Sequence, residues 1–212
     1  MPVTSNEWKM MEPLLHLALT QTDVQAAFVY RFDRDQPVAR LSAFVGPIDR
    51  SRPVELQGPS VAFHQERRTP IVLSDGVSAN GRFADFPEFR AGHFHGVISV
   101  PLVTPDGVVG VANFCRTTSA AIRAKDHAFL IALAAPLAAL SITESLREEL
   151  RRTTQQLADR KLLERAKGLL QEALGWTEDE AYKHVRRLSR QQRIPMREIA
   201  RELIQARMQE SA

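Results

Sequence analysis

Residues 97–114 read Val97-Ile-Ser-Val-Pro-Leu-Val103, then Thr-Pro-Asp-Gly107, then Val108-Val-Gly-Val-Ala-Asn-Phe114. Two runs rich in β-branched residues flank a Pro-Asp-Gly sequence, and such runs are typical of strands. The tip of a tight turn between two strands needs a residue that tolerates positive φ, which glycine supplies. The segment therefore predicts a β-hairpin that turns at Gly107.

The chain on either side of the hairpin predicts a mixed α+β domain. Apolar residues recur at helical spacing over residues 6–20 and again over 122–133. Strand-like runs cover residues 25–32 and 38–45, and a third presumed strand covers 70–74. We expect a helix followed by an antiparallel sheet and a closing helix.

The hairpin and the helix behind it resemble the last two strands and the closing helix of a GAF domain, and a looser resemblance covers residues 5–145. The resemblance implies a five- or six-stranded antiparallel sheet with helices on one face and a small-molecule pocket on the other. The family uses this fold for sensing and dimerisation. Residues 1–140 are thus expected to form a GAF-like sensor and dimerisation domain.

The segment 75–96 is long and rich in aromatic residues, so it predicts a lid over the sheet. The expected pocket residues are Phe63, Phe83, Phe86, His93 and His95. The two histidines are two positions apart, which does not suit one helical face, and we expect neither metal nor another cofactor. The arrangements associated with cyclic-nucleotide and bilin GAF domains are absent from the sequence. The sequence therefore does not identify a ligand. A purely structural domain that binds no ligand is an equal alternative.

The C-terminal quarter carries its own start and stop signals for helices. Gly175 follows an apolar-periodic run as a helix stop, and Thr177 with Glu180 forms a capping box that starts the next helix. In that helix Ala181, Val185 and Leu188 share one face, whereas Lys183, Arg187 and Arg190 share roughly the opposite one. A third helix is predicted from Pro195, with an apolar stripe of Met196, Ile199, Leu203 and Ala206. Three short helices can share one small core.

This region resembles an ANTAR domain in three stretches: Arg160-Lys-Leu-Leu-Glu-Arg-Ala-Lys-Gly168, Glu180-Ala-Tyr-Lys-His-Val-Arg-Arg-Leu-Ser189 and Ile199-Ala200. The resemblance implies that residues 159–212 form a three-helix module that binds paired stem-loops in nascent messenger RNA and prevents transcription termination. Lys167 and Gly168 match signature positions of the family. The sequence departs from the family where methionine and leucine are common, with Gln171 and Val185.

The excess of positive charge lies in the C-terminal third of the chain. Residues 141–212 hold 15 Lys and Arg against 12 Asp and Glu, which accounts for the whole net charge of +3. A basic surface suits a partner with phosphates, although charged helix stripes are often only solvated faces. Charge reversal at Lys167 and Arg187 together is expected to abolish RNA binding and to retain the fold. The predicted RNA-binding residues are Arg160, Arg165, Lys167, Gly168, Tyr182, Arg186, Arg187 and Arg190.

One continuous helix is predicted from Lys125 to Ala173, with residues 141–158 as a coiled-coil linker. Leu146, Leu150, Thr153 and Leu157 alternate spacings of four and three, which is a heptad seam with one polar member. We therefore expect a homodimer packed along this seam. The alternative is a lone amphipathic helix that folds back on its own sheet.

Composition argues for a cytoplasmic protein that is not an enzyme. The single cysteine among the 212 residues, Cys115, permits no internal disulfide and is expected inside a strand. The longest apolar run, 129–142, is too short to span a bilayer and contains Pro136, so we expect no membrane anchor. No phosphate loop, zinc-protease motif or nucleophile elbow is present in the sequence.

The sequence thus predicts a cytoplasmic transcription antiterminator that binds RNA stem-loops as a dimer, with a possible small ligand or a change of oligomeric state at the GAF domain controlling it. The runner-up is a signalling regulator that uses the cationic face on duplex DNA or on an acidic protein partner. Competition between hairpin RNA and duplex DNA separates the two.

Overall fold

The computed structural model describes residues 8–33, 36–46, 55–90 and 93–210 of the chain. The chain divides into two compact units, residues 1–145 and residues 146–212. We call them the N-terminal unit and the C-terminal unit, and each is described by itself.

The N-terminal unit is built on one six-stranded antiparallel sheet with the order β3-β2-β1-β6-β5-β4. The predicted hairpin is confirmed: β5 and β6 pair from Gly96 opposite Arg116 to Thr104 opposite Gly107. Gly107 has a φ of 145°, as the turn requires. The strands are β1 (Ala26–Phe32), β2 (Val38–Val45), β3 (Glu55–Gln57), β4 (Ile71–Leu73), β5 (Gly96–Thr104) and β6 (Gly107–Arg116).

Two short elements were missing from the sequence prediction. Strand β3 has three residues, of which only the middle one, Leu56, is buried, and this alternation is too short for a sequence pattern to detect. The strand predicted as the third, at residues 70–74, is therefore the fourth, β4. Helix α2 (Pro59–Glu66) follows β3 and was also not predicted. The sheet thus has six strands, within the range expected from the GAF resemblance.

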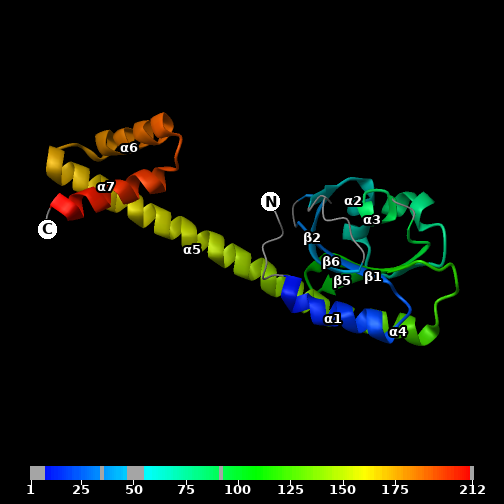
Figure 1. Ribbon diagram of the computed structural model, residues 1–212. Coiled ribbons are helices and arrows are strands. Elements are labelled where there is room, and N and C mark those ends of the chain that lie inside the picture. The colour runs from blue at the N-terminus through cyan, green and yellow to red at the C-terminus, as the bar shows by residue number, and fades with distance from the viewer. Residues whose placement is uncertain (1–7, 34–35, 47–54, 91–92, 211–212) are drawn as a thin grey trace. The chain divides into compact units, whose positions relative to one another are not determined.

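Alternation along the strands gives the sheet two buried faces (Figure 1). On one face Ala27 and Val29 of β1 pack with helix α1 (Trp8–Gln21), helix α4 (Ala124–Ala132) and the start of α5. On the other face Phe28 and Tyr30 pack with α2 and with the segment that follows β4. That segment contains the short helices η1 (Val77–Ala79), η2 (Gly81–Phe83) and α3 (Pro87–Arg90).

The predicted continuous helix is interrupted once. Helix α4 ends at Ala132 and α5 (Ala134–Leu174) begins two residues later. Pro136 has no N–H to donate to the carbonyl four residues earlier, which is that of Ala132. The N–H groups of Leu133 and Leu137 still donate to carbonyls four residues back, at 3.3 Å and 3.1 Å. The break therefore follows from a single proline.

The stretch Ala124–Leu174 contains one window long and apolar enough to cross a membrane, judged by length and composition alone. Its apolar side chains Leu130, Leu133 and Leu137 are buried against the sheet. Part of this hydropathy is therefore used in the core of the N-terminal unit.

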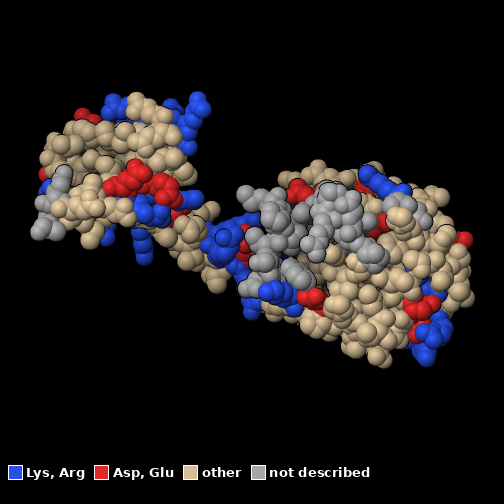
Figure 2. Space-filling model, in the orientation of Figure 1, with Lys and Arg blue, Asp and Glu red and all other residues tan. Residues whose placement is uncertain are grey.

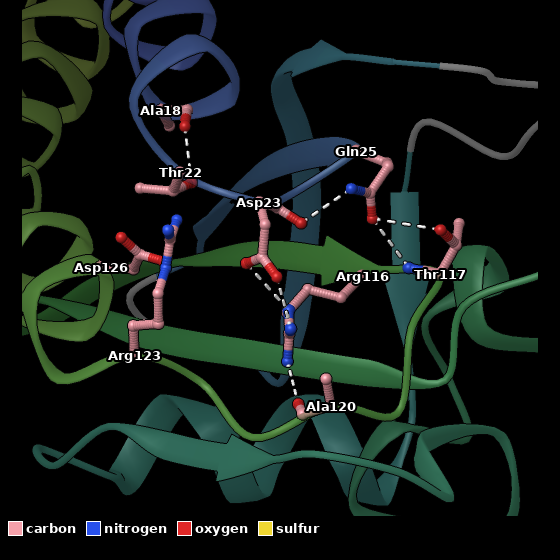
Figure 3. A network of polar contacts seen from close by, with 9 residues as sticks. All are labelled: Ala18, Thr22, Asp23, Gln25, Arg116, Thr117, Ala120, Arg123 and Asp126. Carbon is pink, nitrogen blue, oxygen red and sulfur yellow. Dashed lines mark hydrogen bonds and ion pairs between the residues drawn. The ribbon is translucent and has the colours of Figure 1, made fainter.

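Buried Arg116 ties the end of β6 to the chain that precedes β1 (Figure 3). Its guanidinium donates to both carboxylate oxygens of Asp23, at 3.1 Å and 2.5 Å, and to the carbonyl of Ala120 at 2.5 Å. The side chain of Gln25 accepts a 2.9 Å bond from the N–H of Thr117 beside it. These contacts join segments far apart in sequence at the ends of β1 and β6, the two central strands of the sheet.

The C-terminal unit consists of the rest of α5, α6 (Glu178–Gln192) and α7 (Met196–Glu210). Gly175 ends α5 with a φ of 65°, and the capping box between Thr177 and Glu180 opens α6, both as predicted. The helices pack through Ala166, Leu162 and Leu169 of α5 and Ala200, Leu203 and Ile204 of α7. The predicted stripe of α7 is wrong at its end, because Ala206 is exposed and Ile204 takes the core position.

Candidate functional sites

The outward face of α6 carries a cluster of cations. Ala181 and Val185 are fully buried on the opposite side, so the helix can present its polar residues to solvent. Figure 2 shows Lys and Arg gathered along the side of the C-terminal unit on which α6 runs. The exposed members are Lys183, Arg186, Arg187, Arg190 and Arg193, and Tyr182 lies beside them with 37% of its surface exposed.

These cations fall into two groups. Lys183 forms an ion pair with Asp179 in the preceding turn, and Arg187 donates to Nδ1 of His184 at 3.0 Å. By contrast, Arg186, Arg190 and Arg193 form no ion pair or side-chain hydrogen bond with any residue in the described part of the chain. We call these three the free arginines. An anion that binds them does not have to displace a carboxylate of the described chain.

Lys167, predicted as a phosphate ligand, lies elsewhere. Its side chain is 7% exposed and its ammonium lies between Glu164 at 2.8 Å and Glu178 at 2.7 Å. The hydrogen bonds that the Lys167 ammonium donates to Glu164 and Glu178 raise the pKa of Lys167. The lysine thus joins α5 to the first turn of α6. The charge-reversing Lys167→Glu would bring three carboxylates together, so we now expect this variant to destabilise the junction between α5 and α6 as well as to remove a cation.

The remaining predicted RNA-binding residues lie on α5. Arg160 and Arg165 are exposed and form no ion pair with any residue that the structure describes. Gly168 is exposed in the interior of the helix, and a Cβ built on it would meet no atom within 4 Å. A glycine in the interior of a helix costs about 0.5–1 kcal/mol relative to alanine. No contact within the described chain requires glycine at this position.

The predicted pocket residues of the N-terminal unit separate into core and surface. Phe83 and Phe86 are 1% and 0% exposed and lie in the core over the sheet. Phe83 packs edge to face against Phe89, and Phe86 packs edge to face against His64. Phe63 is half-buried against the same core. His93 and His95 are exposed, and His95 contacts Asp75 at 3.4 Å, so the two histidines do not line the core with the phenylalanines.

His64 lies inside this aromatic core. Its Nδ1 lies 2.8 Å from the carbonyl of Ser60, and its Nε2 is buried without a partner among the described residues. Rings of Phe83 and Phe86 stand 5.0 Å and 5.1 Å away. Burial lowers the pKa of His64; the hydrogen bond to the Ser60 carbonyl opposes this effect, and the charge of Arg67 adds to it.

We expect the N-terminal unit to lose stability as the pH falls below about 6.5, the ordinary pKa of histidine. Because the folded pKa of His64 is lowered, the unfolded chain binds the proton first, and stability is complete only above the unfolded value. One such group changes the free energy of unfolding by at most about 1.4 kcal/mol per pH unit. Urea unfolding at pH 7.5, 6.5 and 5.5 measures it.

The variant His64→Gln is expected to flatten this dependence. Burial also lowers the pKa of His184 in the C-terminal unit, so His184→Gln is the matched control that isolates each unit's share. Unfolding followed by hydrogen exchange of the strand amides reports on the N-terminal unit alone. A wild-type protein equally stable at pH 7.5 and 5.5 would contradict the expectation.

Comparison with known families agrees with the two units. Residues 6–140 match the GAF domain family and residues 151–204 match the ANTAR domain family. The chain belongs to the GAF family and carries an ANTAR domain after it. It is therefore a GAF–ANTAR regulator, as the two resemblances in the sequence predicted. No curated protein matches the sequence significantly.

Solved structures resemble the N-terminal part of the chain at the level of fold. The GAF domain of a phosphoenolpyruvate-protein phosphotransferase from Coxiella burnetii has a TM-score of 0.56 at 18% identity, over 69% of this chain and 89% of that one. The corresponding Acinetobacter domain gives 0.55 at 20% identity, over 68% and 86%. A type II free methionine-R-sulfoxide reductase from Thermoplasma acidophilum gives 0.51 at 19% identity, over 64% and 92%.

Proposed function

We propose that this chain is a transcription antiterminator that binds paired stem-loops in nascent messenger RNA as a homodimer. The ANTAR domain places it in an RNA-binding antiterminator family. The observation that carries the proposal is the group of three free arginines on the outward face of α6, next to the exposed ring of Tyr182.

The chemistry of this face suits an RNA loop. Arginines without internal partners neutralise phosphates and release counterions, which supplies most of the affinity. Bases in a loop are unstacked and reachable, and an exposed tyrosine ring can stack on one of them. Each protomer contacts one hairpin, and a dimer that holds two hairpins of one transcript gains from the high effective concentration.

The N-terminal unit regulates this activity rather than performing chemistry of its own. GAF domains are sensors, and a small ligand or a change of oligomeric state is the signal we propose here. The chain's single cysteine, Cys115, is buried in β6, where its thiol contacts the carbonyl of Asn113 at 3.8 Å. A thiol in that position acts as a small core residue and not as an accessible nucleophile.

The test uses the full chain and a pool of synthetic RNAs, each with two hairpins whose loops are randomised. Selected RNAs are compared with the single hairpins and with duplex DNA of the same stem sequence. We expect the two-hairpin RNA to bind most tightly. Preference for the duplex DNA would show that the chain binds DNA instead of RNA. Binding of neither nucleic acid would contradict the proposed role of the free arginines.

Removing two free arginines is expected to weaken binding strongly. Arg186→Ala with Arg190→Ala should raise the Kd for the selected RNA by on the order of 100-fold, since each lost cation removes a charge-assisted contact. The slope of log K against log salt should fall by about 1.4 to 1.8. Filter binding at several salt concentrations measures both quantities.

The matched control removes the same charge from α7. Arg197 pairs with Asp159 at 3.5 Å and Glu198 at 3.3 Å, and Arg201 pairs with Glu198. Arg197→Ala with Arg201→Ala should change the Kd much less than the α6 pair does. Equal losses for both pairs would show that net charge, and not the face of α6, determines affinity.

A further inference from the structure

Arg193 is the only residue other than glycine with a positive φ in the described part of the chain. It ends α6 with φ 58° and ψ 32°, which is the left-handed conformation. A residue with a Cβ is disfavoured there, and helices that end this way usually use glycine, or sometimes asparagine. Arginine at this position therefore opposes the stability of the C-terminal unit.

The backbone around Arg193 requires nothing that only arginine supplies. The N–H groups of Arg193 and Ile194 both donate to the carbonyl of Ser189, the second at 3.2 Å. The hydroxyl of Ser189 donates to the carbonyl of Ile194 at 2.6 Å. These bonds close the end of the helix and would form equally with glycine at position 193.

The side chain of Arg193 extends a row that already carries binding chemistry. Tyr182, Arg186, Ser189 and Arg193 follow one another at spacings of four, three and four residues, so they lie along one side of α6. Arg186 and Arg193 are both free arginines, and Tyr182 exposes part of its ring at the start of the row.

We propose that this row is a contact track for a single RNA loop strand, with Arg193 as a phosphate ligand at its end. The inference rests on the proposed RNA-binding function and assigns it a strand path along α6. A base stacks on Tyr182 at one end, and the two arginines hold phosphates further along the same side of the helix. The left-handed conformation of Arg193 then lowers the stability of the C-terminal unit, while its side chain raises the affinity for RNA.

A purely structural role for Arg193 makes the opposite prediction. A cation near the C-terminus of a helix is attracted by the helix dipole, and losing it would destabilise α6. Under our proposal the relief of the left-handed conformation is the larger effect. The sign of the stability change on removing Arg193 therefore separates the two roles.

The test compares Arg193→Gly, Arg193→Asn and Arg193→Lys in the full chain, with the selected two-hairpin RNA as the probe. We expect Arg193→Gly to raise the Tm of the C-terminal unit by about 2–4 °C and to raise the Kd about tenfold. The slope of log K against log salt should fall by about one. Arg193→Asn should behave in the same way, because asparagine tolerates positive φ without a charge.

The lysine variant keeps both the charge and the backbone cost, so it should retain the wild-type Tm and most of the salt slope. Wild-type protein that binds the RNA while Arg193→Gly binds equally well would overturn the contact track and leave the proposed function standing. A lower Tm in Arg193→Gly would assign the residue to the helix dipole instead. Wild-type protein that binds no RNA would overturn both proposals.

Discussion

Replacing Asp23 with alanine is expected to lower the free energy of unfolding of the N-terminal unit by about 3 kcal/mol or more. This is large for a side chain that is 43% exposed. The reason is its partner: the side chain of Arg116 is fully buried, and Asp23 supplies its only carboxylate among the described residues. Without Asp23 the guanidinium keeps one bond, to the carbonyl of Ala120, and remains a buried, uncompensated charge.

The other partner should be much less sensitive. Arg116→Met removes the buried charge and fills similar space, and the half-exposed carboxylate of Asp23 can be hydrated by water. We expect less than half of the loss seen for Asp23→Ala. The double variant should resemble Arg116→Met alone and not the sum of the two, because the interaction is shared.

A surface pair of the same unit provides the control. Arg40 and Glu55 lie 3.0 Å apart with side chains 39% and 48% exposed, so Glu55→Ala should cost less than about 1 kcal/mol. Urea unfolding at pH 7.5, followed by circular dichroism, measures all four variants. If Asp23→Ala costs no more than Glu55→Ala, the buried guanidinium is not held as we describe.

The hairpin at residues 97–114 could be predicted because two independent signals, β-branched runs and a glycine turn, coincide in one segment. Strand β3 could not, because three residues carry no period. The break at Leu133 could have been expected from Pro136, whose missing N–H acts locally. Features that depend on residues close in sequence could therefore be predicted. Short elements that depend on neighbours in space could not.

The candidate site shows the same division. The capping box of α6 and its buried face involve residues within one helix, and both were predicted. Lys167 meets Glu178 across a helix junction, and this contact depends on how two helices pack. Arg193 did leave a signal: a helix that must end before Pro195, with no glycine at hand, forces another residue into the left-handed conformation.

Charging the seam of α5 is expected to dissociate the proposed dimer. Leu146, Leu150 and Leu157 are 57%, 67% and 55% exposed and alternate with Thr153 at heptad spacing. Leucines repeated along one helix face and left exposed in a single chain suit the seam of a two-stranded coiled coil.

The seam is flanked by charges that are already engaged along the helix. Glu148 accepts hydrogen bonds from Arg151 at 3.0 Å and Arg152 at 2.7 Å. The bond from Arg151, followed by that from Arg152, lowers the pKa of Glu148 to about 2, so the carboxylate stays ionised. The flanks therefore remain polar at neutral pH, and we infer that a second copy covers only the leucine face.

Leu150→Glu with Leu157→Glu should convert the full chain to a monomer at tens of micromolar, because four carboxylates would meet at the seam of a dimer. The folded protomer should be unaffected, since both leucines are largely exposed in a single chain. Affinity for the two-hairpin RNA should fall by about 10² to 10⁴, whereas affinity for one hairpin should not change. Size-exclusion chromatography with light scattering, together with filter binding, measures the two effects.

Two further variants bracket the result. Ala158→Glu places the same charge at an exposed position of the same helix that lies outside the heptad spacing, and it should leave the dimer intact. Thr153→Leu completes the apolar seam and should tighten the dimer. A wild-type protein that is already a monomer would remove the seam from the mechanism. A charged-seam monomer that binds the two-hairpin RNA as tightly as wild type would show that the two contacts are not linked through α5.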